Sequence, residues 1–268
     1  RLYMEIKFEK WQGLGNDFVI LKDKKATPEL AKELCDRNFG IGADGLFSIK
    51  ETNEADIAWD FYNSDGSIAQ MCGNGIRCFA KYVYENGYVN KKKFSVMTLR
   101  GTVIPEILDD GLVKVDMGEP VLCAEKIPVI TKDPMNFEVE GYMASAVSMG
   151  NPHCLIFTEE DGEILAKKDG RKIETSKIFP EKTNVEFINV ISPSKIKVNV
   201  WERGCGITLA CGTGACASTV AGIKKGLLEN KVEVLLPGGT LYIEWEGKNV
   251  FMTGPALKSF EGTYFHKN

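Results

Sequence analysis

Histidine is scarce in this chain, and closely paired Cys-x-x-Cys spacings are missing from it. The 268 residues include eight cysteines but only two histidines, His153 and His266. Structural zinc sites usually combine paired cysteines with further cysteine or histidine ligands. The short cysteine intervals here, 72–78, 205–211 and 211–216, do not fit that pattern. We therefore expect no metal site.

Long apolar runs and a large excess of one charge are also missing. No stretch approaches the roughly 18 apolar residues of a membrane-spanning helix, and the first residues lack the apolar core of a signal peptide. The formal net charge is -4, so the electrostatics do not favour nucleic acid or an anionic membrane. These absences predict a cytoplasmic location, reduced cysteines, and no nucleic-acid or membrane partner.

The most informative stretch runs from Glu202 to Cys216 and is rich in glycine. An apolar, strand-like run ends at Trp201, and an Ala- and Val-rich sequence after Cys211 predicts a helix that stops at Gly226. Cys211 is therefore expected at a helix start. Unpaired N–H groups and the helix dipole favour negative charge there, which predicts a thiol pKa below the usual value of ~8.5.

This stretch has a counterpart earlier in the chain. Cys72 begins a second Cys-Gly-x-Gly segment, 139 residues before Cys211, and a second helical run follows it. A Gly-Asn pair likewise occurs twice, with Asn16 lying 135 residues before Asn151. Two similar halves, each with a Gly-Asn loop and a cysteine at a helix start, indicate a duplicated domain.

The remaining pattern consists mostly of short strands with one principal helix in each half. Turn signals such as Asp109-Asp110-Gly111 separate strands that we expect to pair in an antiparallel way. The chain is long enough for two domains with separate cores. This pattern predicts the α+β fold class.

Several functions remain open at this point. Glycine-rich loops suit nucleotides, but neither segment is Gly-x-Gly-x-x-Gly or a Walker loop. A thiol hydrolase using a cysteine and His153 leaves the second Cys-Gly-x-Gly segment unexplained. A binding module could use both loops to hold a carboxylate. Free cysteines are often small buried hydrophobic residues, and we expect that role for the six cysteines other than Cys72 and Cys211.

Together the motifs resemble a known family. The segments are Gly-Leu-Gly-Asn-Asp-Phe (13–18), Asn-Ser-Asp-Gly (63–66), Met-Cys-Gly-Asn-Gly-Ile-Arg-Cys (71–78), Gly-Asn-Pro-His (150–153), Thr-Asn-Val (183–185) and the Glu-Arg-Gly to Ala-Cys-Gly-Thr-Gly-Ala-Cys stretch (202–216). In this order and spacing they are similar to diaminopimelate epimerase. Their combination is far more specific than any one of them.

The resemblance implies two pseudo-symmetric domains, each a bent antiparallel β-sheet wrapped around a central helix. The halves would be residues 1–120, completed by a C-terminal strand at 256–268, and residues 121–255. It also implies a homodimer that interconverts L,L- and meso-diaminopimelate, a small-molecule substrate, without a cofactor. The active site would lie in a cleft between the domains, and the reaction would serve lysine and cell-wall precursor synthesis.

The resemblance also implies roles for individual residues. Cys72 and Cys211 would transfer protons, and His153 and Glu202 would orient the reacting amino group and tune the thiols. Backbone amides would hold the reacting α-carboxylate, where negative charge develops; these belong to Gly73, Asn74, Gly212 and Thr213. Other residues would hold the distal end of the substrate or line its pocket: Asn16, Asn63, Asn151, Asn184 and Arg203.

Overall fold

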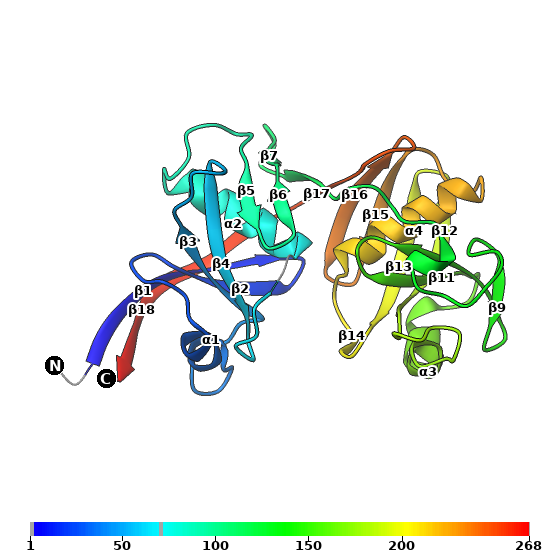
Figure 1. Cartoon of the computed structure of the whole chain (residues 1–268), viewed down its shortest axis with the longest axis horizontal. Helices are drawn as coiled ribbons and strands as arrows, with labels where there is room; N and C mark the ends of the chain where they lie inside the picture. The colour runs from blue at the N-terminus through cyan, green and yellow to red at the C-terminus, as the bar shows by residue number, and fades with distance from the viewer. Residues whose placement is uncertain (1–2, 70–71, 268) are drawn as a thin grey trace. The chain divides into compact units, whose positions relative to one another are not determined.

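The computed structural model describes residues 3–69 and 72–267. Met71 of the sequence motif lies outside the described residues, as do residues 1, 2 and 268 of the predicted halves. The chain divides into two compact units, residues 1–115 with 254–268 and residues 116–253. The second unit is therefore inserted into the sequence of the first (Figure 1).

The first unit contains a seven-stranded sheet and two α-helices. Its strand order is β18-β1-β2-β3-β4-β5-β6. The strands are β1 (Tyr3–Gly13), β2 (Asn16–Leu21), β3 (Gly45–Lys50), β4 (Ile57–Asn63), β5 (Val96–Thr98), β6 (Gly101–Val103) and β18 (Leu257–Lys267). The helices are α1 (Pro28–Cys35) and α2 (Gly73–Glu85), and a hairpin joins β7 (Pro105–Ile107) to β8 (Val113–Asp116).

The second unit contains two α-helices, a short 3-10 helix and a sheet that continues in the order β17-β16-β15-β13-β12-β11-β10-β9. Its helices are η1 (Ala124–Lys126), α3 (Gly162–Glu174) and α4 (Gly212–Lys224). Its strands are β9 (Phe137–Val139), β10 (Tyr142–Ser148), β11 (Pro152–Phe157), β12 (Asn184–Ser192), β13 (Lys195–Glu202), β14 (Gly206–Ile207), β15 (Lys231–Leu236), β16 (Gly239–Trp245) and β17 (Val250–Gly254).

The two units repeat one plan. Strand neighbours β1-β2-β3-β4-β5-β6 alternate between antiparallel and parallel pairing, and β10-β11-β12-β13-β15-β16 follow the same alternation. The helices α1 and α2 connect the parallel pairs of the first unit, and α3 and α4 connect those of the second. The predicted α+β class with two pseudo-symmetric halves is confirmed.

The sheets nevertheless contain parallel strand pairs beside the antiparallel pairs that were expected. The parallel pairs are β2–β3 and β4–β5 in the first unit, and β11–β12 and β13–β15 in the second. A parallel pair needs a crossover connection long enough to return to the same end of the sheet. Each helix supplies one, so every half contains two crossover helices rather than one principal helix.

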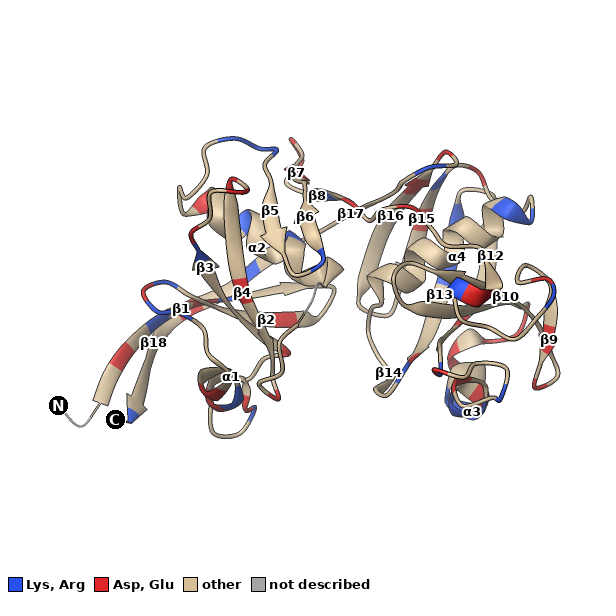
Figure 2. Ribbon diagram, in the orientation of Figure 1, with Lys and Arg blue, Asp and Glu red and all other residues tan. Residues whose placement is uncertain are grey.

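The helix boundaries follow from local sequence. Thr27 caps α1 by accepting a hydrogen bond from the Leu30 amide, and Pro28 occupies the first helical position. Gly226 follows α4 with a φ of 71°, a left-handed conformation that glycine adopts without steric cost. The ribbon in Figure 2 shows the positions of basic and acidic residues interspersed along the elements of both units, α3 included.

Separate apolar clusters stabilise the units. One cluster of the first unit gathers Ile6, Val19, Leu21, Leu34 and Leu46 beneath α1. A cluster of the second unit joins α3 to its sheet through residues such as Leu165, Ile173 and Phe187. The helices α2 and α4 are also largely buried. Their first residues are therefore held by packed structure, which matters for the site below.

Gly170 of α3 provides a test of this packing. A Cβ atom at Gly170 would lie 2.6 Å from both Cβ and Cγ of Trp201, the residue that precedes Glu202 at the end of β13. Alanine favours a helix over glycine by about 1 kcal/mol, but overpacking costs about 1–3 kcal/mol. We expect Gly170→Ala to destabilise the protein by about 2 kcal/mol in urea unfolding. Lys168→Ala, at an exposed position of the same helix, should change the free energy of unfolding by less than about 0.5 kcal/mol.

Candidate active site

In the first unit, Cys72 is the N-cap residue of α2. Its φ and ψ are -140° and 125°, and its Sγ accepts a hydrogen bond from the Gly75 amide at 3.4 Å. The same sulfur lies 3.4 Å from Oδ1 of Asn16, which also accepts a hydrogen bond from the Asn74 side chain at 3.2 Å. The structure thus brings Cys72, Asn16 and Asn74 together at a helix start.

A cavity of about 450 Å³ opens beside Cys72. Its lining includes the predicted residues Asn16, Asn63 and Cys72, together with Asp44, which sequence reasoning missed. Asp44 accepts a hydrogen bond from Nδ2 of Asn16 at 2.6 Å. Arg37 in turn lies 3.0 Å from Asp44 and 2.8 Å from Asp17, so an ion network fixes this wall of the cavity.

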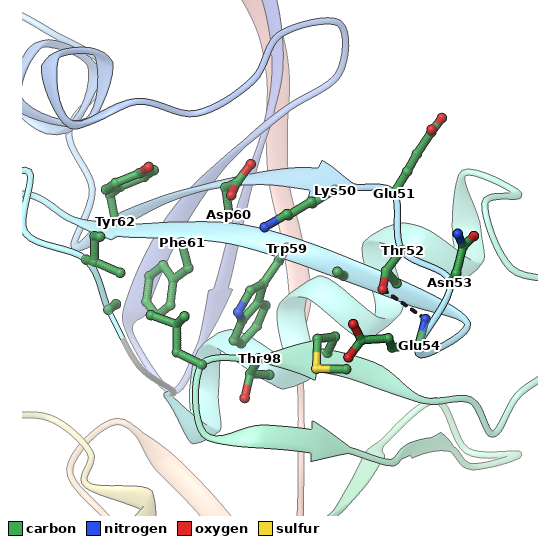
Figure 3. Close-up of a pocket in the computed structure, with 15 residues that line it drawn as sticks. Lys50, Glu51, Thr52, Asn53, Glu54, Trp59, Asp60, Phe61, Tyr62 and Thr98 are labelled. Carbon is green, nitrogen blue, oxygen red and sulfur yellow. Dashed lines mark hydrogen bonds between the residues drawn. The ribbon is translucent and has the colours of Figure 1, made fainter.

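A larger pocket of about 630 Å³ in the first unit adjoins this cavity and shares Phe61, Ile68 and Ala69 with it (Figure 3). Trp59, Phe61 and Thr98 contribute side chains to it, and the Glu54 amide donates a hydrogen bond to the Thr52 hydroxyl at its rim. The described residues that line this pocket include none of the predicted site residues. Its size therefore does not mark the reactive centre.

In the second unit, Cys211 is the N-cap residue of α4. Its Sγ accepts a hydrogen bond from the Gly214 amide at 3.4 Å and lies 3.5 Å from the Thr213 hydroxyl. Nδ2 of Asn151 donates to the same hydroxyl at 3.2 Å. The predicted residues Cys211, Thr213 and Asn151 are thus in one cluster, at a helix start equivalent to that of Cys72.

His153 joins this cluster through a carboxylate that sequence reasoning missed. Its Nδ1 lies 2.7 Å from Oε1 of Glu186, and its Nε2 lies 3.2 Å from Oδ1 of Asn151. His153 and Glu186 are both fully buried. The signal in the sequence was Glu186 between the apolar residues Val185 and Phe187, as the one charged residue of β12, because a buried strand position rarely carries charge without a partner.

The ligand atoms of His153, Glu186 and Cys211 all lie within 4.8 Å of one another. Such a set could also hold a divalent ion, because imidazole, carboxylate and thiolate are all zinc ligands. A metal would first have to displace the hydrogen bond that joins His153 to Glu186. The geometry suits proton transfer without that change.

The pKa of the Cys211 thiol is high, whereas its place at a helix start predicted a low value. Burial raises its pKa well above the usual value, and the carboxylates of Glu202 and Glu186 raise it further. The hydrogen bonds from Thr213 and from the Gly214 amide lower it, as the helix start predicts, but they have the smaller effect. Burial therefore outweighs the helix terminus at Cys211.

The remaining predicted side chains lie at the neighbouring ends of β12 and β13: Asn184 begins β12, Glu202 ends β13 and Arg203 follows it. Oε1 of Glu202 accepts a hydrogen bond from Thr208 at 2.5 Å. Oδ1 of Asn184 accepts a hydrogen bond from the backbone amide of Arg203 at 2.8 Å, and Nδ2 of Asn184 donates one to the carbonyl of Pro152. The guanidinium of Arg203 is exposed, with Nη1 donating to the Glu181 carbonyl at 3.1 Å. Asn184 thus fixes the backbone that presents Arg203.

The arrangement of strands and helices places the chain in a class of two-unit α+β proteins. Solved structures of similar fold include a phenazine biosynthesis protein of the PhzF family from Bacillus anthracis, with a TM-score of 0.68 and 14% identity over 97% of this chain and 99% of that one. A hydroxyproline epimerase from Agrobacterium vitis aligns with a TM-score of 0.67 and 13% identity over 100% of this chain and 93% of its own. These likenesses establish the fold.

Sequence comparison establishes the family. The family described as diaminopimelate epimerase matches residues 8–123 and 145–258. The diaminopimelate epimerase of Carboxydothermus hydrogenoformans is 49% identical over 97% of this chain and 100% of its own length. That of Picosynechococcus sp. is 47% identical over 97% of this chain and 99% of its own. The chain belongs to the diaminopimelate epimerase family.

No helix in residues 3–69 and 72–267 is long and apolar enough to cross a membrane.

Proposed function

We propose that this chain interconverts L,L- and meso-diaminopimelate without pyridoxal phosphate, in lysine and cell-wall precursor synthesis. The observation that carries the proposal is the near full-length match to diaminopimelate epimerases, combined with two helices that are each capped by a cysteine. The proposal includes the halves 1–120 with 256–268 and 121–255, a homodimer and a cytoplasmic location.

In the proposed reaction, Cys72 and Cys211 act on opposite faces of one α-carbon. One thiolate removes the α-proton, and the other cysteine delivers a proton from its thiol. The electron pair left on the carbon is delocalised into the α-carboxylate. The amide N–H groups of Gly73, Asn74, Gly212 and Thr213 begin the two capped helices and suit that negative charge, because such donors are already oriented when it develops.

Other residues of the proposed site hold the substrate. His153 and Glu202 orient the reacting amino group and tune the thiols, and Asn16 lines the pocket beside Cys72. Asn63, Asn151, Asn184 and Arg203 hold the distal amino-acid end. An epimerisation assay on L,L-diaminopimelate beside lysine, glutamate and histidine tests the proposal. Preferential conversion of any of the last three would overturn the assigned substrate.

A thiol hydrolase is the second candidate, since Cys211, His153 and Glu186 form a cysteine–histidine–carboxylate set. Such a hydrolase would need only this one cysteine. Thioester and amide substrates would then be cleaved equally well by the wild type and by Cys72→Ala. The epimerase needs both cysteines, so Cys72→Ala distinguishes the two functions.

Arg203→Ala is expected to weaken substrate capture far more than thiol reactivity. A guanidinium can hold a carboxylate through two hydrogen bonds, whereas the Arg203 amide that binds Asn184 remains in the variant. We expect kcat/KM to fall about a hundredfold. Iodoacetamide labelling of Cys72 and Cys211, quantified on separate peptides, should be nearly unchanged. Labelling that fell together with activity would assign Arg203 to thiol activation instead.

A further inference from the structure

Because the two units share one strand topology, the positions around Cys72 and Cys211 can be compared one by one. Phe18 on β2 pairs in register with Gly45 on β3, and Phe47 lies two residues after Gly45. His153 on β11 pairs with Asn184 on β12, and Glu186 lies two residues after Asn184. Phe18 and Phe47 therefore hold, in the first unit, the positions that His153 and Glu186 hold in the second.

The glycine three residues after each cysteine supports this correspondence. A Cβ atom on Gly75 would lie 2.8 Å from the Phe47 ring and 3.3 Å from Cβ of Cys72. A Cβ atom on Gly214 would lie 2.5 Å from Oε1 of Glu186 and 3.2 Å from Sγ of Cys211. The Phe47 ring is thus close to the helix start at Cys72, and the Glu186 carboxylate is close to the helix start at Cys211.

The aromatic pair and the polar pair make very different contacts. The rings of Phe18 and Phe47 pack with their centroids 5.1 Å apart. In the second unit, the two nitrogens of His153 both face oxygen acceptors, Oε1 of Glu186 and Oδ1 of Asn151. The orientation of the Asn151 amide is consistent with this, because its Nδ2 donates to the Thr213 hydroxyl. Two acceptors around one imidazole suit its doubly protonated, positively charged form.

The surroundings of Glu186 also favour a nearby positive charge. Its carboxylate is fully buried, and Oε2 has no hydrogen-bond partner among the described residues. A buried carboxylate with a bare oxygen is costly unless a cation compensates it. The ionisable groups around it are His153 and Cys154 on β11, Cys211 at the start of α4 and, near Cys211, Glu202 at the end of β13. His153 is the cation that the geometry provides.

We propose that Glu186 is a positioning residue that holds His153 in its doubly protonated form beside Cys211, so that the imidazolium stabilises the thiolate of Cys211. In the first unit, phenylalanines occupy the positions equivalent to His153 and Glu186. The two proton-transfer groups of the reaction are thereby unequal. This inference rests on the proposed function for its catalytic meaning, but its main tests need no substrate.

The direction in which the pH midpoint of Cys211 alkylation moves distinguishes this role from direct repulsion between Glu186 and the Cys211 thiolate. A carboxylate that acted directly on Cys211 would oppose its thiolate, and removing that charge would move the pH midpoint of Cys211 alkylation downward. A carboxylate that acts through His153 favours the thiolate, and its removal moves the midpoint upward. For Glu186→Gln, which keeps the size and an acceptor oxygen, we expect an upward shift of about one pH unit. Peptide-resolved iodoacetamide labelling measures Cys72 in the same sample as an internal control, and its midpoint should not move.

The His153→Gln variant tests whether Glu186 acts on Cys211 through His153. In His153→Gln, Glu186 can influence Cys211 only directly, so adding Glu186→Gln should shift the midpoint downward or leave it unchanged. Glu174→Gln is the matched control, because Glu174 is a buried carboxylate of the same unit that bonds Trp201 and Gly204 instead of His153. This control should leave the Cys211 midpoint at its wild-type value.

The scarcity of histidine makes the protonation state directly observable. With ¹⁵N-histidine labelling, His153 and His266 give the two imidazole signals of the chain, and His266→Gln assigns them. We expect both nitrogens of His153 to carry protons at pH 7 in the wild type and one nitrogen to lose its proton in Glu186→Gln.

Because Glu186 is fully buried, kcat should fall about tenfold to a hundredfold while KM changes little. A singly protonated His153 in the wild type, or a downward Cys211 shift in Glu186→Gln, would overturn the inference. If neither protein epimerised diaminopimelate, the labelling and ¹⁵N results would still decide the role of Glu186.

Discussion

Replacement of Cys72 or of Cys211 by alanine is expected to abolish epimerisation. Each cysteine caps its own helix, and neither Ala variant has a group that could move a proton at that position. The expected loss in kcat is about 10³-fold or more. Cys78→Ala is a suitable control, since Cys78 is a fully buried cysteine of the same helix as Cys72 and lies outside the proposed mechanism.

Isotope incorporation gives the same prediction a sharper form. In D₂O the delivering thiol carries deuterium, because free thiols exchange rapidly with solvent. Early in the reaction the newly formed stereoisomer should contain one deuterium at the inverted carbon, while the unreacted isomer remains protiated. Mass spectrometry of the separated isomers measures both. A product without deuterium, or substantial epimerisation by Cys72→Ala, would rule out the two-thiol mechanism.

Arg77→Met is expected to cause the largest loss of stability. Arg77 is fully buried in α2 and donates to the carbonyl of Pro255 at 3.1 Å, to the carbonyl of Gly73 at 3.1 Å and to the side chain of Asn74 at 2.8 Å. Methionine fills much of the volume but leaves these acceptors without donors. Since each unsatisfied buried group costs about 1–3 kcal/mol, we expect a loss of about 3–5 kcal/mol.

Urea unfolding monitored by circular dichroism measures this loss. Lys81→Met on the same helix is the matched control, because it removes one positive charge from a partly exposed position whose partner is Glu85. Its effect should be below about 1 kcal/mol. An Arg77→Met protein as stable as the Lys81→Met control would show that Arg77 does not anchor the start of α2.

Local sequence predicted the ends of the functional helices well. Cys72 and Cys211 both occupy N-cap positions, and Gly226 ends α4, because capping residues and glycine act within one turn of the chain. The parallel strand pairs were missed. A short strand such as β15 has the same alternation of apolar residues whichever direction its neighbour runs, so its partner is decided by the connection rather than by its own residues.

The missing parts of the site have a similar origin. Glu186 is the one charged residue of β12, and its role depends on His153, which lies 33 residues earlier. Asp44 becomes relevant because it bonds Asn16, 28 residues earlier in the chain. The pKa of Cys211 was expected to be low from its place at a helix start, but burial raises it. Burial is a property of the packed unit, so no local pattern could have shown it.

The long strand β18 has a consequence for the order in which the protein is made. It pairs with β1 over nearly its whole length, from Tyr3 with Lys267 to Gln12 with Leu257. During synthesis β1 emerges before the inserted unit and β18 emerges after it, so one edge of β1 lacks its partner strand while the inserted unit is being translated. Unpaired strand edges invite association between chains. We therefore expect that edge of β1 to be open to association with other chains until β18 has been made and has paired with it.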